Sequence, residues 1–102
     1  MVGPLAEAAL KNFYCDKLFL GIDSFNMEEG ISTPNIEEAH LNQNMIEKAK
    51  QVIAVCDSSK FNRRSFAFIA PVKKLDAVIT DGAVPQEIRT KLKEEGVEVY
   101  IA

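Results

Sequence analysis

Two runs of consecutive apolar residues, 18–22 and 52–56, each five residues long, stand out along the chain and stop at polar segments. Runs of this length that end at turn residues are typical of β-strands. They are apolar at successive rather than alternate positions, which indicates strands buried on both faces, as in a parallel sheet covered by helices. The predicted strands are residues 17–22, 51–56, 76–80 and 97–101.

Apolar residues at helical spacing predict helices around these strands. The first covers residues 4–13, before the first strand. The second follows Thr33-Pro34-Asn35, where Asn35 can cap the helix and Glu38 stands in the position of a capping box. The residues expected to form its buried stripe are Ile36, Ala39, Met45, Ile46 and Ala49.

A third helix is predicted to begin at Pro85 and to end near Gly96, which is the usual place for a glycine after a helix. Its inner face is expected to carry Ile88 and Leu92.

Two connections complete the pattern. Residues 23–33 are interpreted as a loop, and residues 61–75 as a mixed connection in which Phe66, Phe68 and Ile69 pack inward. The alternation of helices and strands predicts an α/β fold, a Rossmann-like parallel sheet flanked by helices and joined by right-handed crossovers. Because the first helix has no strand before it, the chain is expected to be part of a domain.

Polar residues stand directly after two of the predicted strands. Asp23-Ser24 follows the first strand and Asp57-Ser58-Ser59-Lys60 follows the second. Ligands of such sheets bind beyond the carboxyl ends of the strands, so these residues predict one rim of a small-molecule pocket.

Each candidate site residue also has a structural interpretation. Asp23 could bind sugar hydroxyls or act as a base, or it could cap nearby amides. Capping is the favoured role of Asn35, which leaves Thr33 available for a ligand. The acids of the first helical turn, including Glu38, suit the helix dipole and are less suited to acid–base chemistry. Lys60 could meet a phosphate as a point charge, or could be solvated.

Composition excludes several classes of function. The net charge of −3 over 102 residues argues against this chain holding nucleic acid by itself, because such binding depends on clustered Lys and Arg. The two cysteines and the single histidine do not have the spacing of a metal site. No apolar stretch is long enough to span a membrane and no signal peptide is evident, so we expect a cytoplasmic protein. No cofactor or metal is expected.

The chain resembles the C-terminal effector domain of DeoR-type bacterial transcriptional repressors. The resemblance rests on residues 19–23 (FLGID), 30–39 (GISTPNIEEA) and 57–61 (DSSKF), with the opening VGPLA and the closing LDAVITD. The family resemblance implies the fold of pentose-phosphate isomerases. Residues 40–43, which are rich in amides, and residues 62–64, which are basic, are most similar to the branch of this family that governs galactosamine and N-acetylgalactosamine use.

The resemblance implies a sensor of a phosphorylated sugar or amino sugar that changes operator binding by the intact repressor. Asp23 and Lys60 would line the effector pocket, with Thr33, Asn35 and Glu38 nearby and Lys60 facing the anionic group. No residue is expected to be catalytic. DNA would be bound only through an N-terminal domain that the chain lacks, and a homo-oligomer is expected.

The chain departs from the family pattern in several ways. Residues 1–102 correspond to the C-terminal part of the sensor, so its first half, with the family's phosphate loop, is expected to be absent. Ser24 and Asn62 stand where many members have glycine. The alternative function is a sugar-phosphate isomerase or amino-sugar phosphate deaminase, but residues 32–35 replace the glycine-rich loop of those enzymes. A third hypothesis is an oligomerisation module without a ligand.

Overall fold

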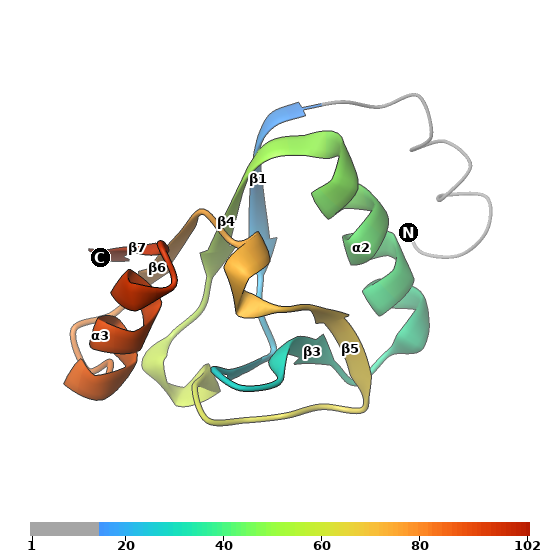
Figure 1. Cartoon of the computed structure of the whole chain (residues 1–102). Coiled ribbons are helices and arrows are strands. Elements are labelled where there is room, and N and C mark those ends of the chain that lie inside the picture. Colours follow the sequence, from blue (N-terminus) through green and yellow to red (C-terminus); the bar gives the residue numbers. More distant parts are fainter. Residues whose placement is uncertain (1–14) are drawn as a thin grey trace.

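The computed structural model describes residues 15–102, and the helix predicted over residues 4–13 lies outside them. The described part contains a parallel four-stranded sheet, in which neighbouring strands lie in the order β1-β4-β6-β7 (Figure 1). The bounds are β1 (Cys15–Gly21), β4 (Ala49–Val55), β6 (Ala77–Thr80) and β7 (Glu98–Ile101). The α/β class and all four predicted strands are therefore confirmed.

The second predicted helix is α2 (Ile36–Lys48), and Asn35 caps it as expected. The side-chain oxygen of Asn35 accepts hydrogen bonds from the backbone N–H groups of Glu37 at 2.8 Å and Glu38 at 3.1 Å. Of the expected stripe, Ala39 is buried, and Met45, Ile46 and Ala49 pack against the core. Ile36 is 52% exposed, so its predicted burial is wrong. It is the first residue of α2, and its neighbours at positions 34, 35, 37 and 38 are exposed as well.

The third predicted helix is α3 (Gln86–Glu94), preceded by Pro85. Its buried residues are Ile88 and Leu92, as the helical spacing predicted. Gly96 has φ +80°, a left-handed conformation that a residue without Cβ adopts readily at the end of a helix.

A second, antiparallel sheet was missed by the sequence interpretation. It contains β2 (Ser24–Asn26), β3 (Gly30–Thr33) and β5 (Ala67–Ala70), in the order β2-β3-β5. The loop predicted over residues 23–33 is thus a hairpin, and its turn is closed by Asn26, whose side chain accepts from the amides of Glu28 and Glu29. Figure 1 shows this sheet beyond the carboxyl ends of β1 and β4.

The side chains of β5 correct another expectation. Ile69 is buried, but Phe68 is 51% exposed and Phe66, just before the strand, is 83% exposed. Along a strand successive side chains point to opposite faces, so Phe68 and Ile69 cannot both face the core. Two short 3₁₀ turns, η1 (Ser58–Lys60) and η2 (Val72–Lys74), flank β5 in the chain.

The two sheets share one hydrophobic core. Phe25 of β2 is fully buried, and its ring centroid lies 4.9 Å from that of Phe61, which follows η1. The core also includes residues from the large sheet and both helices: Leu20, Ala39, Ala54, Val78, Ile88 and Leu92. The small sheet is therefore fixed against the edge where the parallel strands end.

Candidate functional site

Aspartates follow three adjacent strands at this edge. Asp23 comes after β1, Asp57 after β4 and Asp81 after β6. Backbone hydrogen bonds continue the sheet up to these residues, from the Ile22 N–H to the Val55 carbonyl and from the Cys56 N–H to the Ile79 carbonyl, both 3.1 Å. The two strand ends predicted to form one rim do so, and Asp81 extends that rim.

Thr33 lies at the centre of the first polar cluster. Its side chain is 2% exposed, and its hydroxyl donates to Asp23 Oδ2 at 2.9 Å. Glu38 Oε2 is 3.3 Å from the same hydroxyl. A hydroxyl has one proton to donate, so it cannot satisfy both carboxylates at once. Oxygens of the two exposed acids therefore remain as acceptors for donors on a ligand.

Local structure explains why Asp23, Thr33 and Glu38 meet. Asp23 leaves β1, Thr33 ends β3, and Glu38 lies in the first turn of α2. The Glu38 carboxylate lies within hydrogen-bonding distance of the Thr33 hydroxyl. Among residues 15–102 no hydrogen bond from the Asn35 N–H to Glu38, which a capping box requires, is found. The sequence thus named the members of this cluster, while the hairpin brought them together.

Asn35 is placed beside this cluster but has a structural role. Its side-chain oxygen is occupied by the first-turn amides of α2, so these amides are not free to receive an anion. The favoured interpretation, helix capping, is confirmed, and contact between Asn35 and a ligand stays a prediction.

The second polar cluster is the turn that contains Lys60. Asp57 accepts hydrogen bonds from the hydroxyl of Ser59 and from its N–H, the latter at 2.9 Å, and these bonds hold the pKa of Asp57 below its usual value. Asp81 fixes the same turn, because it accepts from the Ser58 N–H at 3.1 Å, and this bond, with one from Ala83, lowers its pKa. Asp81 was missed, although an acid directly after a buried strand was the signal used for Asp23 and Asp57.

Lys60 is half-buried at the end of η1. It lies close enough to Asp57 to contribute to lowering that residue's pKa, after the stronger effect of the Ser59 bonds. None of the ion pairs found in residues 15–102 includes Lys60. A partly buried ammonium at the rim of a sheet is suited to bind an anionic group.

The two clusters lie on adjacent segments of the chain. Phe25 and Phe61 form an isolated parallel bridge, and the Arg63 N–H donates to the Phe25 carbonyl at 3.2 Å. The segment that leaves Asp23 therefore runs beside the segment that carries Lys60. Within residues 15–102, no hydrogen bond or ion pair joins Lys60 to Asp23, Thr33 or Glu38.

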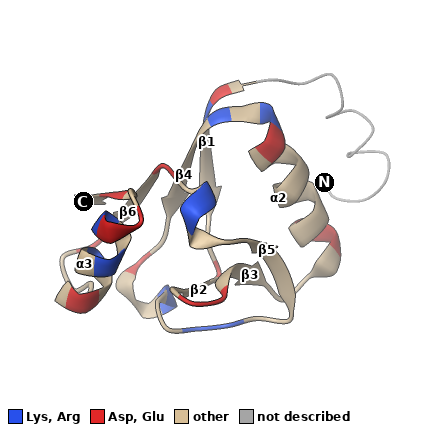
Figure 2. Ribbon diagram, viewed as in Figure 1, with Lys and Arg blue, Asp and Glu red and all other residues tan. Residues whose placement is uncertain are grey.

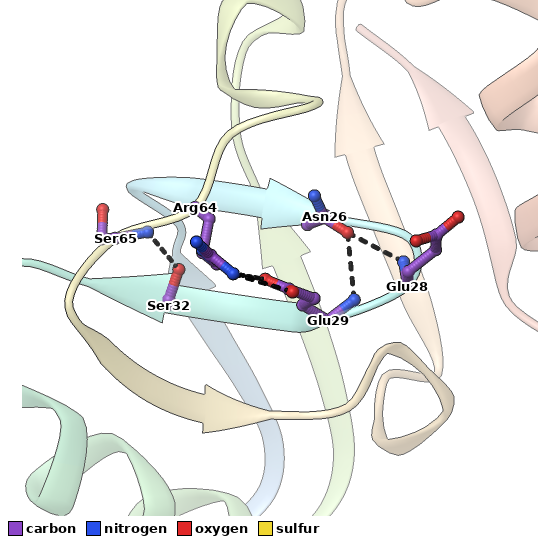
Figure 3. A network of polar contacts seen from close by, with 6 residues as sticks. All are labelled: Asn26, Glu28, Glu29, Ser32, Arg64 and Ser65. Carbon is purple, nitrogen blue, oxygen red and sulfur yellow. Dashed lines mark hydrogen bonds and ion pairs between the residues drawn. The ribbon is translucent and has the colours of Figure 1, made fainter.

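Arg64 belongs to a different network (Figure 3). Its Nη1 bonds both carboxylate oxygens of Glu29, at 2.8 and 2.7 Å, and the neighbouring Ser65 N–H donates to Ser32 Oγ at 2.8 Å. These contacts pin the connection before β5 onto the β2–β3 hairpin. Arg63 and Arg64 are exposed, which confirms that they are surface residues.

Charges are spread over the elements rather than gathered on one of them (Figure 2). Within residues 15–102, no three His, Cys, Asp or Glu side chains are grouped as ligands of a metal ion. No helix in that part is long and apolar enough to cross a membrane.

Cys56 is expected to make the stability of the chain depend on pH. Burial, followed by the charges of Asp57 and Asp81, raises the pKa of its thiol from 9.0 to about 11. The unfolded chain therefore ionises first, and we expect this group's contribution to stability to be complete below pH 9 and to be lost as pH rises toward 11. Urea unfolding measured from pH 8 to 11 should show that the free energy of unfolding falls more steeply with pH for the parent than for Cys56→Ala. Parallel curves for the two proteins would contradict this prediction.

The comparisons with known proteins agree on one family. A family model described as the DeoR C-terminal sensor domain matches residues 1–82. The chain is 43% identical over 99 residues to a putative aga operon transcriptional repressor of Escherichia coli O157:H7, and 40% identical over 99 residues to the HTH-type transcriptional regulator GlpR of Haloferax volcanii. It is 34% identical over 92 residues to the HTH-type transcriptional repressor GlcR of Bacillus subtilis.

These alignments cover 97%, 97% and 90% of the chain but 37%, 39% and 35% of the three relatives. The chain therefore spans less than two-fifths of the length of these regulators. The matched residues include both polar clusters of the strand-end rim. The chain belongs to the family of DeoR C-terminal sensor domains.

Proposed function

We propose that the chain is the effector-sensing portion of a transcriptional repressor of sugar or amino-sugar catabolism, and that its ligand is a phosphorylated sugar or amino sugar. The family is a sensor family, and the named relatives are transcriptional regulators. Neither comparison favours the isomerase or deaminase alternative. The observation that carries the proposal is the cluster of two carboxylates on the buried Thr33 hydroxyl, beside a turn that holds Lys60.

The two clusters suit different ends of such a ligand. Asp23 and Glu38 have oxygens left to accept hydrogen bonds from sugar hydroxyls or from the ammonium of an amino sugar. Lys60 supplies the positive charge for the phosphate. Thr33 orients Asp23 and Glu38, because its buried hydroxyl is fixed by the surrounding core. In this proposal Asn35 contributes by fixing the start of α2.

We further propose that ligand binding changes operator affinity through a DNA-binding domain outside these 102 residues, in the cytoplasm. Three features of the named relatives support this proposal. All of them are transcriptional regulators, two are described as HTH-type, and each is more than twice as long as the chain. A ligand can shift such an equilibrium only by binding one of two conformations more tightly. The ligand's affinity should therefore differ between operator-bound and free repressor.

The test is calorimetry of the chain with phosphorylated hexoses and amino sugars, each paired with its unphosphorylated form. We expect Lys60→Ala to weaken binding of the phosphorylated form by about 10- to 100-fold, as loss of a charged hydrogen bond of about 1.5–3 kcal/mol implies. Binding of the unphosphorylated form should change little. If the parent binds both forms equally well, Lys60 is not a phosphate contact.

Two buried threonines provide a matched comparison for the first cluster. Thr33→Val removes the hydroxyl that orients Asp23 and Glu38. It should therefore weaken binding of both the phosphorylated and the unphosphorylated sugar. Thr80→Val is the control, because Thr80 Oγ1 is buried without a hydrogen-bond partner among residues 15–102. If the two variants bind the sugar equally well, the cluster of Asp23, Thr33 and Glu38 is not part of the binding site. Turnover of any sugar phosphate by the parent would instead favour the enzyme alternative.

A further inference from the structure

Asp81 lies at the strand-end rim, although the proposed function gives it no contact with the ligand. It follows β6 directly, next to the turn that follows the parallel neighbour β4. Both of its side-chain oxygens accept backbone hydrogen bonds: Oδ2 from the Ser58 N–H at 3.1 Å, and Oδ1 from the Ala83 N–H at 2.9 Å. Asp81 therefore joins the turn η1 to the loop that leads into α3.

The two hydrogen bonds of Asp81 differ in kind. The bond from Ala83 spans two residues and closes a local turn that asparagine forms as readily as aspartate. The bond from Ser58 spans 23 residues and is a tertiary contact. An asparagine side chain has one acceptor oxygen, whereas a carboxylate has two, so a carboxylate is needed to form both bonds. The bond from Ser58 is therefore the one that depends on aspartate at this position.

Each backbone N–H of η1 has a partner. The Ser58 N–H donates to Asp81, and the Ser59 N–H donates to Asp57 Oδ1 at 2.9 Å. The Lys60 N–H donates to the Asp57 carbonyl at 3.1 Å. These amides are therefore not available to an anion, and the ammonium of Lys60 is the positive charge that the turn presents. The bonds to Asp57 lie within the turn and its cap, whereas the bond from Ser58 fixes the turn to the end of β6.

The charge of Asp81 has the opposite effect on an anion. Bonds from the Ser58 and Ala83 amides lower the pKa of Asp81, so its carboxylate is ionised at neutral pH. A negative charge beside the turn opposes the approach of a phosphate. Asp81 thus acts on phosphate binding in two ways of opposite sign, by its charge and by its bond to the turn, and an experiment can decide which one is larger.

We propose that Asp81 is a positioning residue of the effector site, which holds η1 so that the Lys60 ammonium meets the phosphate of the ligand. This inference rests on the proposed function. Asp81 acts through Lys60 and does not itself touch the ligand. A charged hydrogen bond depends on its geometry, so an ammonium displaced by a loosened turn loses much of its contact with the phosphate. Contacts of Asp23 and Glu38 with the sugar should be unaffected, because these residues lie on other segments.

Two asparagine substitutions separate the bond from the charge. Both hydrogen bonds that Ser59 donates to the Asp57 side chain go to the same oxygen, Oδ1, so Asp57→Asn can retain both. The bonds to Asp81 go to different oxygens, so Asp81→Asn can retain only one, and its NH₂ group then faces a backbone N–H. The local bond from Ala83 is the one expected to remain. The two variants lose the same charge, but only Asp81→Asn releases the turn.

Calorimetry with glucose 6-phosphate and glucosamine 6-phosphate, each paired with the unphosphorylated sugar, gives the first test. We expect Asp81→Asn to bind the phosphorylated forms about 10-fold more weakly than the parent, and the unphosphorylated forms as the parent does. Asp57→Asn should bind the phosphorylated forms at least as tightly as the parent, because it loses only a repelling charge. If Asp81→Asn binds them as tightly as Asp57→Asn, the charge of Asp81 outweighs its bond and the proposal is wrong.

Combining Asp81→Asn with Lys60→Ala tests whether Asp81 acts through the lysine. In the Lys60→Ala background we expect Asp81→Asn to cause no further loss of affinity for the phosphorylated forms. A further loss of about 10-fold would overturn the proposal, since Asp81 would then act by another route. If Lys60→Ala alone has no effect, the proposed function fails and this inference fails with it. If Lys60→Ala weakens binding and Asp81→Asn does not, only the assignment of Asp81 fails.

Amide hydrogen exchange measured by NMR provides a test without ligand. In Asp81→Asn the Ser58 N–H loses its partner, so it should exchange at least about 10-fold faster than in the parent. The Ser59 N–H is the internal control, because its bond to Asp57 is retained. Equal exchange of the Ser58 N–H in the two proteins would show that Asp81 does not hold the turn, whatever the ligand proves to be.

Discussion

Replacing Gly30 with alanine is expected to lower the free energy of unfolding by about 2–5 kcal/mol, from left-handed backbone strain together with overpacking. Gly30 has φ +92° where the β2–β3 turn enters β3. A Cβ at this position would lie closer than 3.0 Å to the carbonyl oxygen of Ala70 and 3.0 Å from Cα of Pro71. Both are backbone atoms of the segment that leaves β5, so neither can turn aside.

Gly96→Ala is the matched control for this prediction. Gly96 also has positive φ, at +80°, but a Cβ there would meet nothing within 4 Å. Replacing Gly96 should lower the free energy of unfolding only by the backbone strain of an alanine at positive φ, about 1–2 kcal/mol. Urea unfolding of the two variants separates strain from steric conflict. Equal losses of stability would show that the approach of β3 to Ala70 is not as close as the structure indicates.

Replacing Phe25 with alanine is expected to lower the free energy of unfolding by about 3–5 kcal/mol, the usual cost of truncating a buried phenylalanine. Phe25 is fully buried, its ring contacts that of Phe61, and the two residues form the bridge between the two polar clusters. A cavity at this point should also loosen Asp23 relative to Lys60. We therefore expect weaker ligand binding at temperatures where the variant is still folded.

Phe68→Ala removes an equal number of atoms from a side chain that is 51% exposed, and it should cost much less stability. Thermal unfolding compares the two variants, and calorimetry at low temperature compares their binding of the same sugar phosphate. If Phe25→Ala binds as tightly as Phe68→Ala does, the bridge between Phe25 and Phe61 does not position the site.

The candidate site could be predicted from the sequence only in part. Asp23, Thr33, Asn35, Glu38 and Lys60 were recognised by their places after strands and at a helix start, and by the family resemblance. The hydrogen bonds among Asp23, Thr33 and Glu38 could not be predicted, because they depend on a hairpin between strands of three and four residues. Strands this short give too few positions for an alternating pattern to be recognised.

By itself the sequence determined the strands of the parallel sheet and the two described helices. Long apolar runs, the cap at Asn35 and the spacing of Ile88 and Leu92 specify strands and helices, because these signals lie within a few neighbouring residues. Tertiary structure decided the rest: that β5 pairs with β3, and that Asp81 holds the turn before Lys60. Each of these depends on which distant segments lie side by side, and contacts between distant segments leave no periodic trace in either one.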